Sequence, residues 1–202
     1  MKKKIGIMGG TFDPPHIGHL AMAEQVRSAM ALDEIWFIPT GGITYKERDK
    51  ISTPKDRLAM TRLAVVGQPH FSVNPMEAES GKPSYSFETM ERLRTEYPEN
   101  EFVFIVGADS LDYMDAWREP ERLFRCCTVA AVNRTGISRE QMEAKKQMLT
   151  EKFDARIVLV PMPSVDVSST GLRERVSRGE TIQDFVQDGV WDYIQKHQLY
   201  QR

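Results

Sequence analysis

Short apolar runs alternate with longer segments of helical periodicity along almost the whole chain. Alternation of this kind predicts a parallel sheet with helices on both faces. We therefore expect a doubly wound α/β fold, with ligands bound beyond the carboxyl ends of the strands, near the switch in strand order. The expected strands are residues 4–8, 34–38, 71–73, 102–106, 128–132 and 156–160, and the expected helices are residues 18–30, 54–66, 87–97, 120–125, 138–152, 170–177 and 190–197.

Local signals mark the starts of three of these helices. Thr53 stands before a proline, which is typical of a capping residue followed by a first-turn proline. Ser138 and Gln141 have the spacing of a capping box. Ser84 or Ser86 can cap the helix that begins near residue 87.

Length and composition favour one domain, residues 1–202, with a helical C-terminal part from about 168 to 202 packed on it. A domain usually has about 100–200 residues, and 41% of these residues are hydrophobic, enough for a core. The net charge of −2 comes without a polybasic block, so neither nucleic acid nor an anionic membrane is an expected partner.

The sequence also favours the cytoplasm. No apolar run approaches the roughly 18 residues of a membrane span, and no long apolar stretch follows the three lysines after Met1, so we expect no signal peptide. The two cysteines, Cys126 and Cys127, are neighbours. Adjacent cysteines rarely form a disulfide with each other and lack metal-site spacing, so core packing is their expected role.

Residues 9–20, Gly-Gly-Thr-Phe-Asp-Pro-Pro-His-Ile-Gly-His-Leu, join the first expected strand to the first helix. The paired glycines allow a sharp bend, and the two prolines stiffen the loop. His16 and His19 are three apart and can share a face at the helix start, where backbone N–H groups and the helix dipole favour an anion. We interpret this combination as a phosphate site. Loop glycines with two surface histidines are the alternative, and neither a Walker loop nor the dinucleotide fingerprint is present.

A second candidate phosphate site lies near the other end of the chain. Ser168, Ser169 and Thr170 open a helix, and Arg173 follows one turn later. Hydroxyl groups, a helix N-terminus and a guanidinium together suit a phosphate. An ordinary serine cap is the alternative reading of the same residues.

Three further candidates follow strands, where loops face the expected cleft. Lys46 could reach a phosphate as a flexible point charge or be a solvated lysine. Asp109, which follows Gly107, could accept ribose hydroxyls, help to hold magnesium, or cap the next helix. Arg134 could reach a nucleotide.

The middle of the chain offers a candidate carboxylate site and a pair of aromatic side chains. The stretch around Ser84, Tyr85 and Ser86 starts a helix whose free N–H groups could bind a carboxylate. Tyr113 and Trp117 are four apart, so we expect them to line one wall of a helix. They could stack on a flat ring, although core packing is the usual role of such aromatic residues.

From residue 4 to residue 200 these motifs resemble those of the nucleotidyltransferase superfamily, and in detail those of bacterial nicotinate-nucleotide adenylyltransferases. The outer motifs, His-x-Gly-His and Ser-Ser-Thr-x-x-Arg, resemble those of the superfamily. The two middle motifs, around Ser86 and from Asp109 to Trp117, resemble those of the nicotinate branch. The chain departs from the family at Tyr45, which stands where a histidine usually precedes the lysine. The resemblance implies a Rossmann-like nucleotidyltransferase fold.

The resemblance further implies transfer of the adenylyl group of ATP to nicotinate mononucleotide, giving deamido-NAD and pyrophosphate in NAD biosynthesis. Magnesium would accompany ATP, without a metal site built from protein ligands. The implied catalytic residues are His16, His19, Lys46 and Arg173. The implied ATP-binding residues are Gly9, Gly10, Thr11, Phe12, His16, His19, Gly107, Asp109, Arg134, Ser168, Ser169, Thr170 and Arg173, and the implied nicotinate mononucleotide-binding residues are Lys46, Ser84, Tyr85, Ser86, Tyr113 and Trp117.

Two alternatives stay open from the sequence. Another small-substrate adenylyltransferase, such as a pantetheine-phosphate adenylyltransferase, would share the outer motifs but have no use for the Ser86 and Trp117 segments. A non-catalytic ATP-sensing module would bind ATP without turnover. The sequence leaves open the preference for acid or amide mononucleotide, and it leaves open whether the chain is a monomer or a homo-oligomer.

Overall fold

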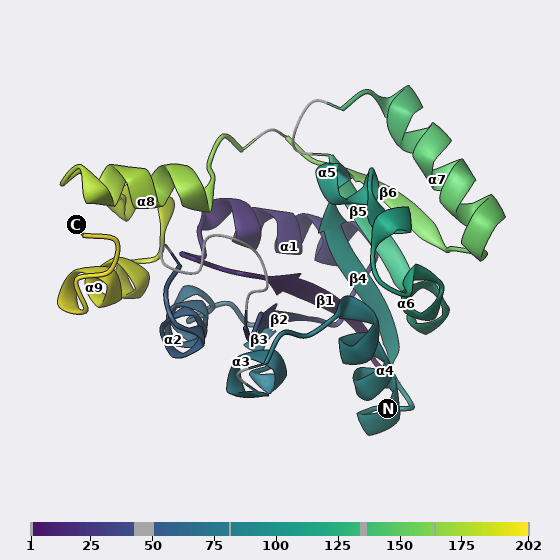
Figure 1. Cartoon of the computed structure of the whole chain (residues 1–202), viewed down its shortest axis with the longest axis horizontal. Helices are drawn as coiled ribbons and strands as arrows, with labels where there is room; N and C mark the ends of the chain where they lie inside the picture. The colour runs from purple at the N-terminus through teal and green to yellow at the C-terminus, as the bar shows by residue number, and fades with distance from the viewer. Residues whose placement is uncertain (1, 43–50, 81, 134–136, 164, 202) are drawn as a thin grey trace. The chain divides into compact units, whose positions relative to one another are not determined.

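Six strands form a parallel sheet in a computed structural model that describes residues 2–42, 51–80, 82–133, 137–163 and 165–201 (Figure 1). Within these residues the strand order is β3-β2-β1-β4-β5-β6. The order switches between β1 and β4, which pair in parallel, as do β4 with β5 and β5 with β6. This is the doubly wound order that the sequence predicts. The strands are β1 (Lys4–Gly10), β2 (Glu34–Pro39), β3 (Phe71–Val73), β4 (Glu101–Gly107), β5 (Thr128–Asn133) and β6 (Ile157–Pro161).

The helices alternate with the strands along the chain. All expected strands and helices are present, with ends within two residues of the prediction. Four of the described elements, two short helices and two 3₁₀ turns, were not expected, because a four- or five-residue helix or a 3₁₀ turn is too short to show a periodicity. The helices are α1 (Ile17–Ala29), α2 (Pro54–Ala64), α3 (Met76–Ser80), α4 (Ser86–Glu96), α5 (Ala108–Leu111), α6 (Pro120–Cys126), α7 (Arg139–Phe153), α8 (Ser169–Ser177) and α9 (Asp188–Lys196), with 3₁₀ turns η2 (Met114–Ala116) and η3 (Gln183–Phe185).

Two of the expected helix caps are confirmed, and one is wrong. Thr53 Oγ1 accepts the N–H of Asp56 at 3.2 Å, and Ser138 forms its capping box with Gln141. At α4, however, the capping position is Tyr85 and not Ser84 or Ser86. The Glu88 carboxylate accepts the Tyr85 N–H at 3.3 Å, which satisfies one backbone donor at the start of this helix.

The chain divides into two compact units, each described here by itself. The sheet unit comprises Met1–Met8, Met22–Trp36 and Tyr85–Val165, and the loop unit comprises Gly9–Ala21, Phe37–Ser84 and Asp166–Arg202. No helix among the described residues is long and apolar enough to cross a bilayer.

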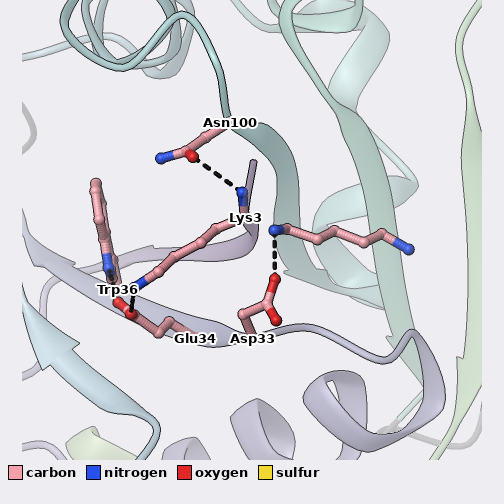
Figure 2. Close-up of polar contacts among 6 residues, drawn as sticks. Lys3, Asp33, Glu34, Trp36 and Asn100 are labelled. Atoms are coloured by element: carbon pink, nitrogen blue, oxygen red, sulfur yellow. Dashed lines mark hydrogen bonds and ion pairs between the residues drawn. The ribbon is translucent and has the colours of Figure 1, made fainter. Parts of the chain in front are cut away.

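The sheet unit is built around β4 and β5. The side chains from Val129 to Val132 are fully buried, α5 packs on both strands, and α7 packs on β6. At the amino ends of the strands, Figure 2 shows a polar network that joins β1 to its neighbours. The Lys3 N–H donates to Asn100 Oδ1 at 3.1 Å, while the Lys3 ammonium and the Trp36 indole N–H both contact the Glu34 carboxylate. This network lies at the strand ends opposite those that carry the candidate motifs.

Both cysteines lie in the core, as the sequence predicts. Cys126 is 7% exposed and Cys127 is 1% exposed, and both are free thiols. Burial raises the pKa of both thiols, that of Cys127 to about 12. Because the thiolate is the reactive form, we expect the native protein to leave the aromatic disulfide reagent DTNB uncleaved at pH 8. Unfolding in guanidinium should expose both thiols, so rapid reaction of the native protein would contradict this packing.

A partly buried ion pair joins η2 to α7 in the sheet unit. Lys145 Nζ donates to Asp115 Oδ1 at 2.8 Å, and this hydrogen bond and the ammonium charge lower the pKa of Asp115 below its ordinary 3.8. A carboxyl group with a lowered folded-state pKa stabilises the fold above its unfolded pKa, and this stabilisation is lost as the pH falls through the folded pKa. Between pH 5 and pH 3, wild type should therefore lose more free energy of unfolding than Asp115→Asn, by up to about 1 kcal/mol. Urea unfolding at several pH values measures this, and equal losses would contradict the assignment.

The loop unit has its own apolar core beneath α2, α8 and α9. Figure 1 shows α2 and α9 as neighbours, and their buried faces meet in one cluster. Val190 and Ile194 of α9 are fully buried there, so this C-terminal helix packs within the loop unit. The buried members of this C-terminal core are Met60, Ala64, Leu172, Val176, Ile182, Val186, Val190 and Ile194.

Candidate functional site

The loop between β1 and α1 is closely packed on itself. We call residues 10–16 the proline loop. Phe12 adopts a left-handed backbone conformation with φ of 51°, and its ring is 2% exposed. A Cβ on Gly10 would lie 3.1 Å from this ring, so the glycine allows Phe12 to fold back over it. The peptide bond between Asp13 and Pro14 is cis.

The two histidines stack on each other at the end of the proline loop. Their ring centroids are 3.7 Å apart with an interplanar angle of 29°, and His16 is 2% exposed. The backbone N–H of His16 donates to Nδ1 of His19 at 3.2 Å. Because Nδ1 accepts this bond, the neutral His19 ring carries its proton on Nε2, which makes that atom a donor.

Gly18, between the histidines, is required by close packing. A Cβ there would lie 2.9 Å from Val167 Cγ1 and 3.1 Å from two atoms of the His16 ring. Any larger residue would displace one of these groups. The glycine of the His-x-Gly-His motif therefore lets the N-terminal motif approach the C-terminal one.

The start of α8 contacts the proline loop directly. Ser168 caps the helix, since its Oγ accepts the Gly171 N–H at 3.2 Å. Ser169 Oγ donates to the carbonyl oxygen of Pro14 at 2.9 Å. The Ser168 hydroxyl therefore caps its own helix, as the capping alternative requires. The Ser169 hydroxyl instead joins the start of α8 to the proline loop.

Arg173 makes the second link between these segments. Its Nη1 donates to the Asp13 carbonyl oxygen at 2.8 Å, and its Nη2 donates to Thr170 Oγ1 at 3.2 Å. The structure thus brings together the two candidate phosphate sites that the sequence places at opposite ends of the chain. Imidazole, guanidinium and hydroxyl groups meet at the N-termini of two helices, an arrangement suited to an anion. The candidates assembled in the loop unit are Gly9, Gly10, Thr11, Phe12, His16, His19, Ser168, Ser169, Thr170 and Arg173.

Asp13 holds the proline loop through a buried carboxylate, a role that the sequence reasoning missed. The residue is 1% exposed, its Oδ1 accepts the Tyr200 hydroxyl at 2.6 Å, and its Oδ2 accepts the Ser52 N–H at 3.1 Å. Burial, together with the neighbouring carboxylate, raises the pKa of Tyr200 above its ordinary value. Tyr200 therefore stays protonated and remains a donor at neutral pH.

Arg57 is the other residue that the sequence reasoning missed. It lies in the first turn of α2, is 1% exposed, and forms hydrogen bonds with three segments. Nη1 donates to the Thr11 carbonyl oxygen at 2.9 Å and to Thr40 Oγ1 at 3.1 Å. Nη2 donates to the carbonyl oxygens of Thr40 at 2.6 Å and Gly41 at 2.7 Å, and Nε donates to that of Ser52 at 3.2 Å. The signal in the sequence is its spacing from Thr61 and Ala64, which puts an arginine on the buried face of the helix.

In the sheet unit, the structure after β4 corrects two expectations about Asp109 and about the pair Tyr113 and Trp117. Gly107 caps α5, so the capping alternative for Asp109 is wrong, and Asp109 is an exposed residue in the first turn. Tyr113 and Trp117 do not share an α-helical wall, because α5 ends at Leu111 and the two residues flank η2. Their rings nevertheless remain neighbours, with centroids 6.3 Å apart.

The Tyr85 segment contacts the segment after Trp117 within the sheet unit. Arg118 Nη1 donates to the Tyr85 hydroxyl at 3.0 Å, and its guanidinium carbon lies 4.6 Å from the centre of the Tyr85 ring. Tyr113 is 53% exposed, which gives it a face for a ligand. The sequence reasoning did not identify Arg118. Ser86 is the first residue of α4, as expected for a residue with a free backbone N–H.

Lys46 and Arg134 lie outside the described residues, and so does Tyr45. Among the residues that are described, no three histidine, cysteine or acidic side chains are grouped so as to hold a metal ion. The exposed Asp109 is a carboxylate just beyond the carboxyl end of β4.

Comparison with known proteins gives one consistent family. The sequence model of the cytidylyltransferase-like family matches residues 7–175. A protein of Geobacillus thermodenitrificans named as a probable nicotinate-nucleotide adenylyltransferase is 39% identical over 197 residues, which cover 98% of this chain and 86% of that protein. A protein of the same name from Exiguobacterium sibiricum is 41% identical, and the match covers 98% of both chains.

The fold has matching solved structures as well. The nicotinic acid mononucleotide adenylyltransferase of Plasmodium falciparum, complexed with NaAD, superimposes with a TM-score of 0.80. The match covers 98% of this chain and 97% of that chain at 20% sequence identity. At this level of identity the likeness shows a common fold.

Proposed function

Because this chain belongs to the nicotinate-nucleotide adenylyltransferase family of cytidylyltransferase-like proteins, we propose that it transfers the adenylyl group of ATP to nicotinate mononucleotide. The products are deamido-NAD and pyrophosphate, and the reaction is a step of NAD biosynthesis. The observation that carries the proposal is the meeting of the proline loop with the start of α8, where Ser169 and Arg173 contact Pro14 and Asp13.

The reaction needs little from the protein beyond positioning and charge. A phosphate oxygen of nicotinate mononucleotide attacks the α-phosphorus of ATP, and the bond to the β-phosphate oxygen breaks to release pyrophosphate. The attacking phosphate is already an anion at neutral pH, so no general base is required. Catalysis then consists of aligning the two phosphates and neutralising the charge that develops on the leaving group.

The proposed contacts follow from these requirements and from the family resemblance. His19 donates from Nε2 to the triphosphate, beside His16, Ser169 and Arg173, and Lys46 provides a further cation. Asp109 and Arg134 bind the nucleoside part of ATP. The proposed contacts of nicotinate mononucleotide are Lys46, Ser84, Tyr85, Ser86, Tyr113 and Trp117, and the backbone amides of the proline loop complete the ATP site.

Magnesium is proposed to accompany ATP, with the exposed Asp109 as the protein carboxylate that could contact it. When bound, the ion would neutralise charge on the phosphates. The protein groups still have to orient the triphosphate and exclude water from the α-phosphorus.

A pyrophosphate-release assay tests the proposed function. Purified protein is incubated with ATP and magnesium, and with nicotinate mononucleotide, nicotinamide mononucleotide or 4′-phosphopantetheine as the acceptor. We expect pyrophosphate and deamido-NAD with nicotinate mononucleotide. Turnover with phosphopantetheine alone would replace the proposal with the alternative transferase, and ATP binding without turnover on any acceptor would identify a sensing module.

A further inference from the structure

Tyr200, close to the C-terminus, contacts the proline loop 187 positions away in the sequence. We propose that Tyr200 is a positioning residue of the reaction: its hydroxyl holds the Asp13 carboxylate and so fixes the loop that presents His16 and His19. The inference rests on the proposed function for its kinetic readout, while its structural readout needs no turnover.

The Asp13 carboxylate requires the donors that surround it. A carboxylate that is 1% exposed has almost no access to water, and burial without hydrogen bonds is strongly unfavourable. Ser52 supplies a donor through its backbone N–H at 3.1 Å, and Tyr200 supplies another at 2.6 Å. Without the Tyr200 hydroxyl, Oδ1 would lose this charge-assisted bond, and the loop would have to shift to regain a donor.

Asp13 is well placed to transmit such a shift to the histidines. The next two residues are prolines, whose fixed φ angles make the connection to His16 stiff. The backbone carbonyl oxygen of Asp13 also accepts a hydrogen bond from the Arg173 guanidinium. A displaced Asp13 would therefore move groups from both candidate phosphate sites.

Tyr200 itself is held firmly enough to act as an anchor. Its ring packs against the C-terminal core of α2, α8 and α9. Its backbone is in the left-handed region with φ of 64°, a costly conformation for a residue with a Cβ. Such a conformation persists where the surroundings determine it, here through the core contact and the bond to Asp13. The packing of the Tyr200 ring therefore directs its hydroxyl toward the Asp13 carboxylate.

The test compares Tyr200→Phe with Tyr193→Phe. Tyr193 is a matched control, because its hydroxyl also donates to a carboxylate, Asp56 Oδ1, at 2.9 Å, but at the start of α2. Each variant loses one Tyr–Asp hydrogen bond and keeps its aromatic ring. We expect Tyr200→Phe to lower kcat about 10-fold, the loss of a bond to a charged group, with an unchanged KM for nicotinate mononucleotide. Tyr193→Phe should keep the wild-type kcat.

Hydrogen exchange gives a readout that is independent of the reaction. In peptides covering residues 11–20, exchange should be faster in Tyr200→Phe than in wild type and unchanged in Tyr193→Phe. Equal kcat and equal exchange in both variants would overturn the inference, as would an equal loss in both, which would indicate general destabilisation. If wild type turns over no acceptor, the proposed function fails, and the exchange comparison alone then decides for or against the positioning role.

Discussion

Replacing His19 with alanine is expected to lower kcat by roughly 10²–10³, the usual cost of deleting one donor to the transition state. The imidazole lies at the start of α1, stacked on His16, and its Nε2 carries the proton because Nδ1 accepts the His16 N–H. That donor would meet charge that grows on the triphosphate as the bond to pyrophosphate breaks. Steady-state kinetics with saturating ATP and nicotinate mononucleotide measure the effect.

Two amide replacements separate the two nitrogens of His19. In His19→Asn the amide oxygen can take the place of Nδ1 and accept the His16 N–H, so the loop should stay folded while turnover falls as in the alanine variant. In His19→Gln the amide nitrogen can take the place of Nε2, so part of the turnover should return. His70→Ala is the control, because this histidine is exposed and lies just before β3, in neither the proline loop nor the start of α1. Near-normal turnover of a folded His19→Ala protein would exclude the assignment.

The sequence predicted the fold because its signals are local. Each strand is a short apolar run and each longer helix has its own periodicity, and the alternation of the two determines a parallel sheet. The Thr53 and Ser138 caps depend on residues three positions apart, so they are readable in the same way. The prediction was wrong at α4, where the capping position is Tyr85 and neither serine, and where the Glu88 carboxylate accepts the Tyr85 N–H.

The candidate site was predictable only in part, for a physical reason. Phosphate motifs consist of glycine, histidine, serine and arginine at short spacing, so His19 and Arg173 could be identified from their own segments. Asp13 bonds partners 39 and 187 positions away, the second being Tyr200, and Arg57 reaches Thr11 46 positions away; no local pattern records such contacts. A local pattern can also mislead. The spacing of Tyr113 and Trp117 predicted that both lie on one helix, but α5 ends at Leu111, before either residue.

Arg57→Met is expected to cause the largest loss of stability. The guanidinium is buried and binds Thr11, Thr40, Gly41 and Ser52, so its removal leaves one buried and several partly buried acceptors without this donor. Each unsatisfied buried group costs about 1–3 kcal/mol, and we expect a total loss of roughly 3–5 kcal/mol. Domains are stable by only about 5–15 kcal/mol, so the variant should be close to unfolding at moderate temperature. Urea unfolding followed by circular dichroism measures the loss.

The same substitution at Arg62 is the control. Arg62 lies on the same helix, but its side chain is 57% exposed and its contact with Glu79 is a surface ion pair of 3.8 Å. Arg62→Met should change the free energy of unfolding by no more than about 0.5 kcal/mol. Arg57→Lys should lie between the two, because one ammonium cannot reach all the oxygens that the planar guanidinium spans. If Arg57→Met proves no less stable than Arg62→Met, the carbonyl groups around Arg57 are satisfied in another way, and the arginine does not hold the proline loop.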